Sequence, residues 1–270
     1  MRYHVCLACS LLVLASVDAR AQDLPAWTPQ HGAFAFPDPN GRRLLATAEL
    51  EQPERLKVAL CSSGERFAVQ FAYKQAASDP AVSRQIPANF DRTSGFVFTV
   101  AGGNALKPDA TCFLAYEALS GSQAFAIQTP DSANGCLSSQ RLQYSRARSR
   151  AVVHCWTIAR VGADRAIALL EFERRGKDAL ASLVIVDPQH SVFADYPAEF
   201  RSEGADLWRV DDGGKLSSEG FQIVCVLQTK AGYALGVVWH GSEGRLPQLW
   251  TVAEGGRFVE VISDYWYHSP

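Results

Sequence analysis

The pattern that most constrains the fold is an alternation with a period of two residues across residues 221–263. Four apolar and aromatic runs stand between glycine-bearing turns: FQIVCVLQ at 221–228, YALGVVWH at 233–240, LPQLWTV at 246–252 and RFVEVIS at 257–263. Successive side chains of a strand point to opposite faces of a sheet, which produces this period. Short runs joined by glycine turns are typical of adjacent antiparallel strands. The segment therefore predicts a four-stranded antiparallel meander.

The run at 233–240 carries large side chains on one face and mostly small ones on the other. The large set is Tyr233, Leu235, Val237 and Trp239, and the opposite set is Ala234, Gly236, Val238 and His240. A strand exposed on one side would carry polar residues there. We expect this strand to be covered on both faces, with another segment packed closely over the small side.

Residues 151–196 follow the same pattern, with runs AVVHCWTIA, AIALLEFE, ALASLVIV and HSVFADY. Cys155 stands in the first run much as Cys225 stands in the first run of the later meander. Two interpretations stay open. The chain contains a duplicated four-strand unit, or two unrelated meanders resemble each other.

The first half is also strand-like but less regular, with candidate strands at 42–50, 55–61, 66–73, 95–101, 111–118 and 123–129. Residues 74–93 are polar and contain two prolines, which predicts a loop with at most a short helix. The arginine-rich segment 137–150 is the best candidate for a boundary. It divides the chain into an N-terminal β-rich half, 22–150, and a C-terminal β-rich half, 151–270, that holds both meanders.

These patterns predict an all-β fold in which antiparallel meanders pack as sandwich-like sheets. The alternative is a small or irregular β-propeller-like arrangement, because a four-stranded meander is also the blade of a propeller. The meanders recur at a wider spacing than propeller blades do, which favours the sandwich.

The amino terminus predicts export. Val5 to Val17 is almost wholly apolar, and Ala19-Arg20-Ala21 has the small-x-small pattern of a cleavage site. Thirteen helical residues rise about 20 Å, short of a hydrocarbon core of about 30 Å, which argues against a membrane anchor. A lipoprotein site at Cys9 is also disfavoured, because most of the apolar run follows it. We expect a signal peptide at residues 1–21, a mature chain from Gln22 with no membrane span, and a periplasmic or extracellular location.

Five cysteines remain after cleavage: Cys61, Cys112, Cys136, Cys155 and Cys225. In an oxidising compartment they allow at most two internal disulfides and leave one thiol. Cys136 follows a polar loop that a bridge could hold, and its nearest cysteines in sequence are Cys112 and Cys155. We favour Cys112–Cys136. Cys155 and Cys225 lie within predicted strands and are expected to be small core residues.

Charge and motifs exclude several classes of function. The full chain has a formal net charge of −2, which gives no general attraction to nucleic acid. Arg146, Arg148 and Arg150 would share one face of an extended segment, where we expect a solvated surface. The sequence lacks the GxSxG, HExxH, P-loop and GxGxxG signatures. We therefore assign no catalytic residue, no metal ligand and no cofactor.

The histidines offer the only groups worth testing for hydrolysis. His154 alternates with apolar neighbours and is expected to be partly buried with one hydrogen bond. His240 with Glu243, and Asp187 with His190, lie at strand ends, where solvated turns are the simpler interpretation. The spacing does not identify a serine or carboxylate partner for any of them.

Aromatic residues crowd the last strands: Trp250, Tyr265, Trp266 and Tyr267. Alternation cannot bury three consecutive aromatic side chains on one face, so these four are candidate binding residues for a protein or a carbohydrate. Core packing of the terminus is the alternative. The resulting hypothesis is an exported bacterial-type binding or accessory protein of unknown ligand, without catalysis. The alternatives are a secreted hydrolase of cell-envelope or extracellular polymer, and a structural part of an envelope assembly.

Overall fold

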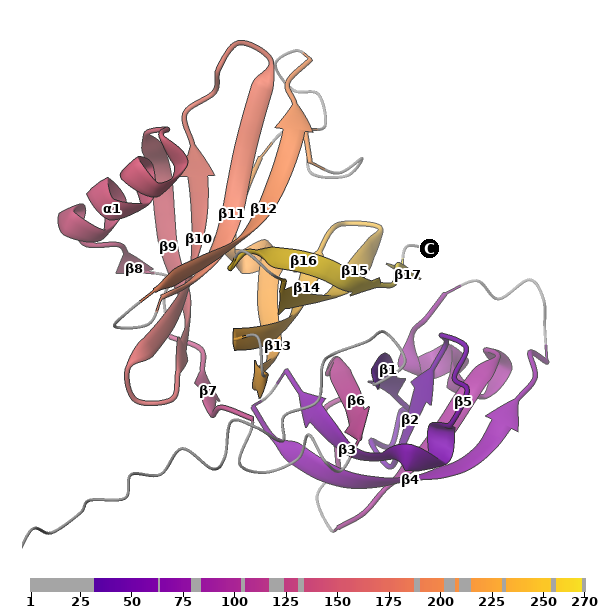
Figure 1. Cartoon of the computed structure of the whole chain (residues 1–270). Coiled ribbons are helices and arrows are strands. Elements are labelled where there is room, and N and C mark those ends of the chain that lie inside the picture. The colour runs from indigo at the N-terminus through magenta and orange to yellow at the C-terminus, as the bar shows by residue number, and fades with distance from the viewer. Residues whose placement is uncertain are drawn as a thin grey trace, which may run out of the picture.

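The computed structural model describes residues 32–62, 64–78, 84–102, 105–116, 124–130, 134–186, 190–201, 207–208, 215–229, 232–253 and 256–268. Antiparallel strands dominate these residues and form a closed barrel, an outer sheet and a middle sheet (Figure 1). The predicted all-β class, with antiparallel meanders in sandwich-like sheets, is confirmed. The predicted signal peptide at 1–21 lies outside the described residues.

The barrel closes through the order β1-β2-β5-β4-β3-β6. Its strands are β1 (Gly32–Pro37), β2 (Arg43–Ala46), β3 (Leu56–Cys61), β4 (Arg66–Gln75), β5 (Gly95–Val100) and β6 (Cys112–Tyr116), with 3₁₀ helices η2 (Pro53–Arg55) and η3 (Pro87–Arg92). Alternation divides β1 between two clusters. Ala33 and Ala35 belong to the cluster made by all six barrel strands, whereas Phe34 and Phe36 pack with the middle sheet.

The outer sheet has the order β12-β11-β10-β9-β7, and β8 pairs with β9. Its strands are β7 (Ile127–Gln128), β8 (Asn134–Gly135), β9 (Val152–Val161), β10 (Arg165–Phe172), β11 (Asp178–Val186) and β12 (Ser191–Glu199). Helix α1 (Ser138–Arg148) covers the face that points away from the middle sheet. Tyr144 of α1 is buried there and meets Phe193 of β12 edge to face, with ring centroids 6.2 Å apart.

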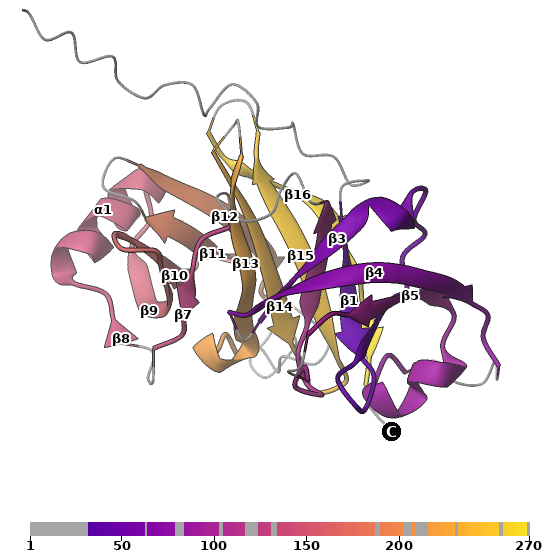
Figure 2. The ribbon, with the colours of Figure 1, turned by 90° about the horizontal axis from the view of Figure 1, so that it is seen from below.

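The middle sheet has the order β13-β14-β15-β16, and β17 pairs with β15. It consists of β13 (Phe221–Thr229), β14 (Gly232–His240), β15 (Gly244–Val252), β16 (Phe258–Ser263) and β17 (Trp266–Tyr267), preceded by the 3₁₀ helix η5 (Ser218–Gly220). Figure 2 shows this sheet between the outer sheet and the barrel. Strands β13, β14 and β15 are therefore mostly buried on both faces, whereas β16 carries exposed residues.

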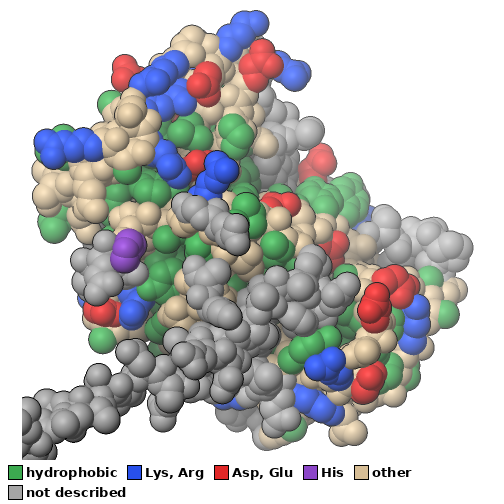
Figure 3. Space-filling view, in the orientation of Figure 1, with side chains coloured by type: hydrophobic (Ala, Val, Ile, Leu, Met, Phe, Trp, Pro, Cys, Tyr) green, Lys and Arg blue, Asp and Glu red, His purple; other side chains and the backbone are tan. Residues whose placement is uncertain are grey.

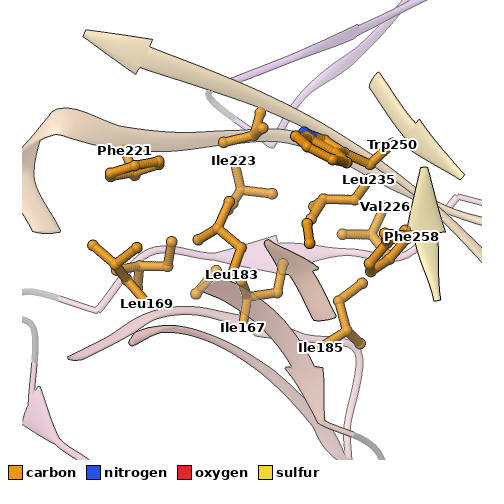
Figure 4. Packing of buried hydrophobic residues seen from close by; sticks show 14 of the residues in the cluster. Ile167, Leu169, Leu183, Ile185, Phe221, Ile223, Val226, Leu235, Trp250 and Phe258 are labelled. Atoms are coloured by element: carbon orange, nitrogen blue, oxygen red, sulfur yellow. The ribbon is translucent and has the colours of Figure 1, made fainter. Parts of the chain in front are cut away.

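Strand β14 confirms the two-faced prediction. Its large side chains, Tyr233, Leu235, Val237 and Trp239, join the cluster between the middle and outer sheets. Figure 4 shows Leu235, Phe221 and Ile223 of the middle sheet pointing toward Ile167, Leu169 and Leu183 of the outer sheet. On the other face, Ala234 and Val238 pack with the barrel. A Cβ atom at Gly236 would lie 2.6 Å from Sγ of Cys225, its partner on β13, so these two strands pack closely at this point.

Two local expectations need correction. Residues 138–148 form a helix instead of an extended segment; these residue types favour helix, and the N–H of Leu137 donates to Oε1 of Gln140. Arg146 and Arg148 therefore point in different directions, and Arg150 is buried with its guanidinium on Asp178. Strand β1 was not predicted at all.

The disulfide prediction Cys112–Cys136 is wrong. Cys61 and Cys112 are direct partners in the register of β3 and β6, with Cα atoms 4.0 Å apart, and they form one bridge. Cys136 follows Gly135, which pairs with Trp156 beside Cys155, so Cys136 bonds to Cys155. Cys225 is the remaining thiol and is buried, as expected.

The boundary at residue 150 and the duplicated-unit hypothesis stay predictions. The described strands fall into the groups 32–116, 127–199 and 221–267 along the chain. The two predicted meanders are β9–β12 and β13–β16, each in sequential antiparallel order.

Candidate functional site

The structure separates the four aromatic residues that the sequence singled out. Trp250 is 8% exposed and lies in the cluster between the middle and outer sheets. Trp266 is fully buried on the barrel side, where its indole N–H donates to Oδ2 of Asp264 at 2.8 Å. Tyr265 is 48% exposed, and Tyr267 is half-buried. The four side chains do not form one exposed surface.

The candidate histidines lie in different settings. The His154 side chain is 57% exposed, contrary to the expected partial burial, and its Nδ1 lies 2.8 Å from Oε2 of Glu171. Nε2 of His240 lies 3.3 Å from Oε1 of Gln222. His190 is exposed, while Asp187 lies outside the described residues. Of the described histidines, His240 and His190 line different hollows of the molecule.

A groove of about 590 Å³ opens where the outer and middle sheets part between β9 and β13. We call it the junction groove. Aliphatic and aromatic core side chains close its base, and mostly neutral polar side chains line the rest. Its lining residues are Thr129, Pro130, Trp156, Thr157, Ile158, Ser218, Glu219, Phe221, Gln222, Ile223 and His240. Ligand sites combine such an apolar wall with a few convergent polar groups, and this volume falls in their usual range.

The indole of Trp156 is held in place by a chain of contacts. His154 and Glu171 face each other in the register of β9 and β10, which allows the Nδ1 contact. The His154 ring stacks on Trp156 with centroids 5.3 Å apart and planes 18° apart. Trp156 also packs against the cluster between the sheets. The groove therefore presents an aromatic ring whose orientation is fixed from two sides.

A second groove of about 320 Å³ adjoins the first on the barrel side. We call it the barrel groove. Gln222 and Thr129 line both grooves, so the two are continuous at this point. The barrel groove adds Ser62, Gly64, Lys107, Asp109, Ala110 and Ile127. It carries charges of both signs, whereas the junction groove contains one carboxylate and no lysine or arginine.

Arg245 of β15 fixes the wall of the barrel groove. Its Nη1 donates to the carbonyl oxygen of Asp109 at 3.2 Å and to Oγ1 of Thr111 at 3.0 Å. Its Nε donates to Nε2 of His268 at 2.8 Å. Burial first, and then the neighbouring Arg245 and His240, lower the pKa of His268 to about 4. His268 is therefore a neutral acceptor at neutral pH.

A third hollow of about 620 Å³ lies between α1, the start of β12 and the middle sheet. It is lined by larger apolar side chains, among them Tyr144, Phe193, Tyr233 and Val252. This hollow shares no lining residue with the junction groove or the barrel groove. We base the candidate site on the two continuous grooves, because they combine an aromatic ring with several polar side chains.

Comparisons add no functional information. No family model, curated protein or solved structure matches this chain. Within the described residues, no helix is long and apolar enough to cross a membrane, and no group of three His, Cys, Asp or Glu side chains could hold a metal ion.

Of the residues that line the junction groove, His240 alone was a candidate from the sequence. Trp156 and Gln222 were not singled out, because both lie inside ordinary strand patterns. The one available signal was the spacing of His154 and Trp156, two residues apart on one face of a strand. Their contact with Glu171, and the meeting of β9 with β13, depend on the tertiary fold.

Proposed function

We propose that this chain is an exported binding or accessory protein that holds a polar ligand in the junction groove. The observation that supports this most directly is Trp156, an aromatic ring oriented by His154 and Glu171 and surrounded by neutral polar side chains. Such a ring offers apolar contact area at little cost in conformational entropy. The surrounding hydroxyl and amide groups supply direction-dependent hydrogen bonds.

We also propose a periplasmic or extracellular location. Two disulfides are compatible with an oxidising compartment, where such bonds persist. The apolar segment Val5 to Val17, followed by Ala19-Arg20-Ala21, supports export through a cleaved signal peptide. Nucleic acid is a poor candidate ligand. On the face shown in Figure 3, Lys and Arg side chains are interspersed with Asp and Glu over the outer sheet and barrel.

A thermal-shift screen with monosaccharides, oligosaccharides, amino acids and short peptides tests the binding function. A compound that raises the melting temperature of the unaltered protein is then measured with Gln222→Ala and with Tyr265→Ala. We expect Gln222→Ala to weaken the shift and Tyr265→Ala to retain it, because only Gln222 lines the groove. Loss in Tyr265→Ala with full retention in Gln222→Ala would instead place binding at the C-terminal aromatic residues.

A secreted hydrolase of envelope or extracellular polymer is the second candidate. The observation in its favour is that Ser218, Glu219 and His240 line the same groove. A hydroxyl, a carboxylate and an imidazole are the groups that hydrolysis requires. Under this alternative, the protein releases soluble fragments from isolated envelope polymer, and His240→Ala abolishes the release. Equal release by both forms would exclude this role for His240.

A further inference from the structure

The continuity of the two grooves indicates the shape of the ligand. Gln222 lies on β13, and Thr129 follows β7; both side chains line the junction groove and the barrel groove. A small compact ligand would use only one of these spaces. The combined path instead runs from Trp156 on the outer sheet, past Gln222 of the middle sheet, to Lys107 and Asp109 beside the barrel.

The chemistry of the path favours carbohydrate over peptide. A sugar ring has an apolar face that can stack on an indole and an edge of hydroxyl groups that both donate and accept. Thr157, Gln222 and Glu219 offer groups of this kind near Trp156. An extended peptide would bind best by adding a strand to a free sheet edge. On β13 the edge is occupied at Val226, whose carbonyl oxygen accepts the N–H of Phe125, and at Leu227, which pairs with Ala124. These positions lie beyond the lining residues 221–223, so strand addition by a peptide at the groove is the competing outcome of the binding test.

We propose that the joined grooves bind a linear oligosaccharide, with one sugar packed against the part of Trp156 that lines the groove and the chain continuing past Gln222 to Lys107 and Asp109. This inference rests on the proposed binding function and specifies its ligand class. Gln222 occupies the centre of the path, where its amide can donate to one sugar and accept from the next. His154 and Glu171 act as positioning residues, because they hold the indole and need not contact the ligand.

The length of the path gives a measurable signature. A single sugar can occupy only the Trp156 end, whereas a longer chain also reaches the barrel groove. Affinity should therefore rise with chain length and stop rising once both grooves are filled. Removing Trp156 should weaken every length. Removing Lys107 should weaken only the lengths that reach it.

The experiment has two stages. A glycan array of linear and branched saccharides first identifies the sugar, and isothermal titration then measures a series from its monosaccharide to its hexasaccharide. The proteins compared are the unaltered chain, Trp156→Ala, His154→Ala, Gln222→Ala and Lys107→Ala, each checked for folding by circular dichroism. We expect Trp156→Ala to weaken all lengths by about tenfold or more, equivalent to about 1.4 kcal/mol. Lys107→Ala should weaken the longest chains severalfold and the monosaccharide not at all.

Several results would overturn the inference, and they differ from failure of the proposed function. Equal affinity for monosaccharide and hexasaccharide, or no effect of Lys107→Ala at any length, would contradict a chain that crosses both grooves. If no glycan binds while another polar ligand does so through Gln222, the ligand class is wrong and the binding function stands. If Trp156→Ala does not fold, His154→Ala and Gln222→Ala carry the same test. Glycan binding that neither changes would place the site elsewhere and reject both proposals.

Discussion

The two faces of the middle sheet meet their neighbours in different ways. Toward the barrel, β14 contributes the small residues Ala234 and Val238, and the large rings come from Phe36 of the barrel and from Trp266 of β17. Toward the outer sheet, the middle sheet supplies the bulk itself through an aromatic cluster of Tyr196, Phe221, Trp239 and Trp250, in which Tyr196 alone belongs to the outer sheet.

This difference explains where a groove can form. Phe221 is part of the aromatic cluster and also lines the junction groove. The groove is therefore the open end of the interface that is filled by large side chains. Large rings hold two sheets apart, and where the strands diverge the remaining space is not filled.

Trp266→Ala should disrupt the packing between the middle sheet and the barrel, and we expect it to have the largest effect on stability. Trp266 is fully buried and packs against Phe36, with ring centroids 5.6 Å apart. Truncation of a buried tryptophan lowers the free energy of unfolding by about 3–5 kcal/mol. Urea denaturation gives this value. Tyr265→Ala is the matched control and should change it by less than about 0.5 kcal/mol, as for other exposed residues. Similar small losses in both variants would show that Trp266 is not a core residue.

Gly236→Ala should show how little space the barrel-facing side of β14 leaves, because it adds one atom next to Cys225 of β13. The new Cβ would lie 2.6 Å from Sγ of Cys225, and overpacking of this kind costs about 1–3 kcal/mol. Cys225→Ala should restore part of the loss in the double variant, since it removes the clashing atom. Gly220→Ala is the control, with its nearest contact at 3.5 Å. Equal effects at both glycines would contradict close packing of Gly236 against Cys225.

The third prediction concerns the pH dependence of the barrel-facing side, and we expect the smallest effect here. The pKa of His268 is lowered from 6.5 to about 4 in the folded protein, first by burial and then by Arg245. The unfolded state then binds more protons between these values, so stability is lost as pH falls from about 6.5 to 4. Urea midpoints measured across this window should fall, and His268→Gln should reduce the fall. An identical pH profile in that variant would exclude His268 as the cause.

The sequence predicted the middle and outer sheets well because their signals are local. Each meander joins neighbours in the chain, so period-two runs and glycine turns specify both strands and order. Closure of the barrel depends on β1 pairing with β6, which are far apart in sequence. β1 itself is a short GAFAFP segment that ends in proline. Helix α1 was hidden because it buries only Tyr144 and carries no apolar stripe.

The disulfides and the candidate site were less predictable than the fold. Cys61 and Cys112 become partners through strand register, which sequence distance does not reveal.

The aromatic residues near the C-terminus were predicted to bind a ligand because four of them lie close together in the sequence. Trp250 and Trp266 are buried on opposite faces of the middle sheet, one against the outer sheet and the other against the barrel. The sequence pattern near the C-terminus does not show that both faces are covered. Trp156 of β9 lines the junction groove because β13 packs beside it, and this tertiary contact is not visible in the sequence either.

The central claim is that ligand binding occurs in the junction groove, and hydrogen–deuterium exchange with a bound oligosaccharide tests it most directly. Backbone amides exchange more slowly where a ligand restricts opening. The account predicts new protection at residues 154–158, 218–223 and 240, which border the groove. Protection confined to residues 264–268, around the exposed Tyr265, with unchanged exchange along the groove, would contradict it.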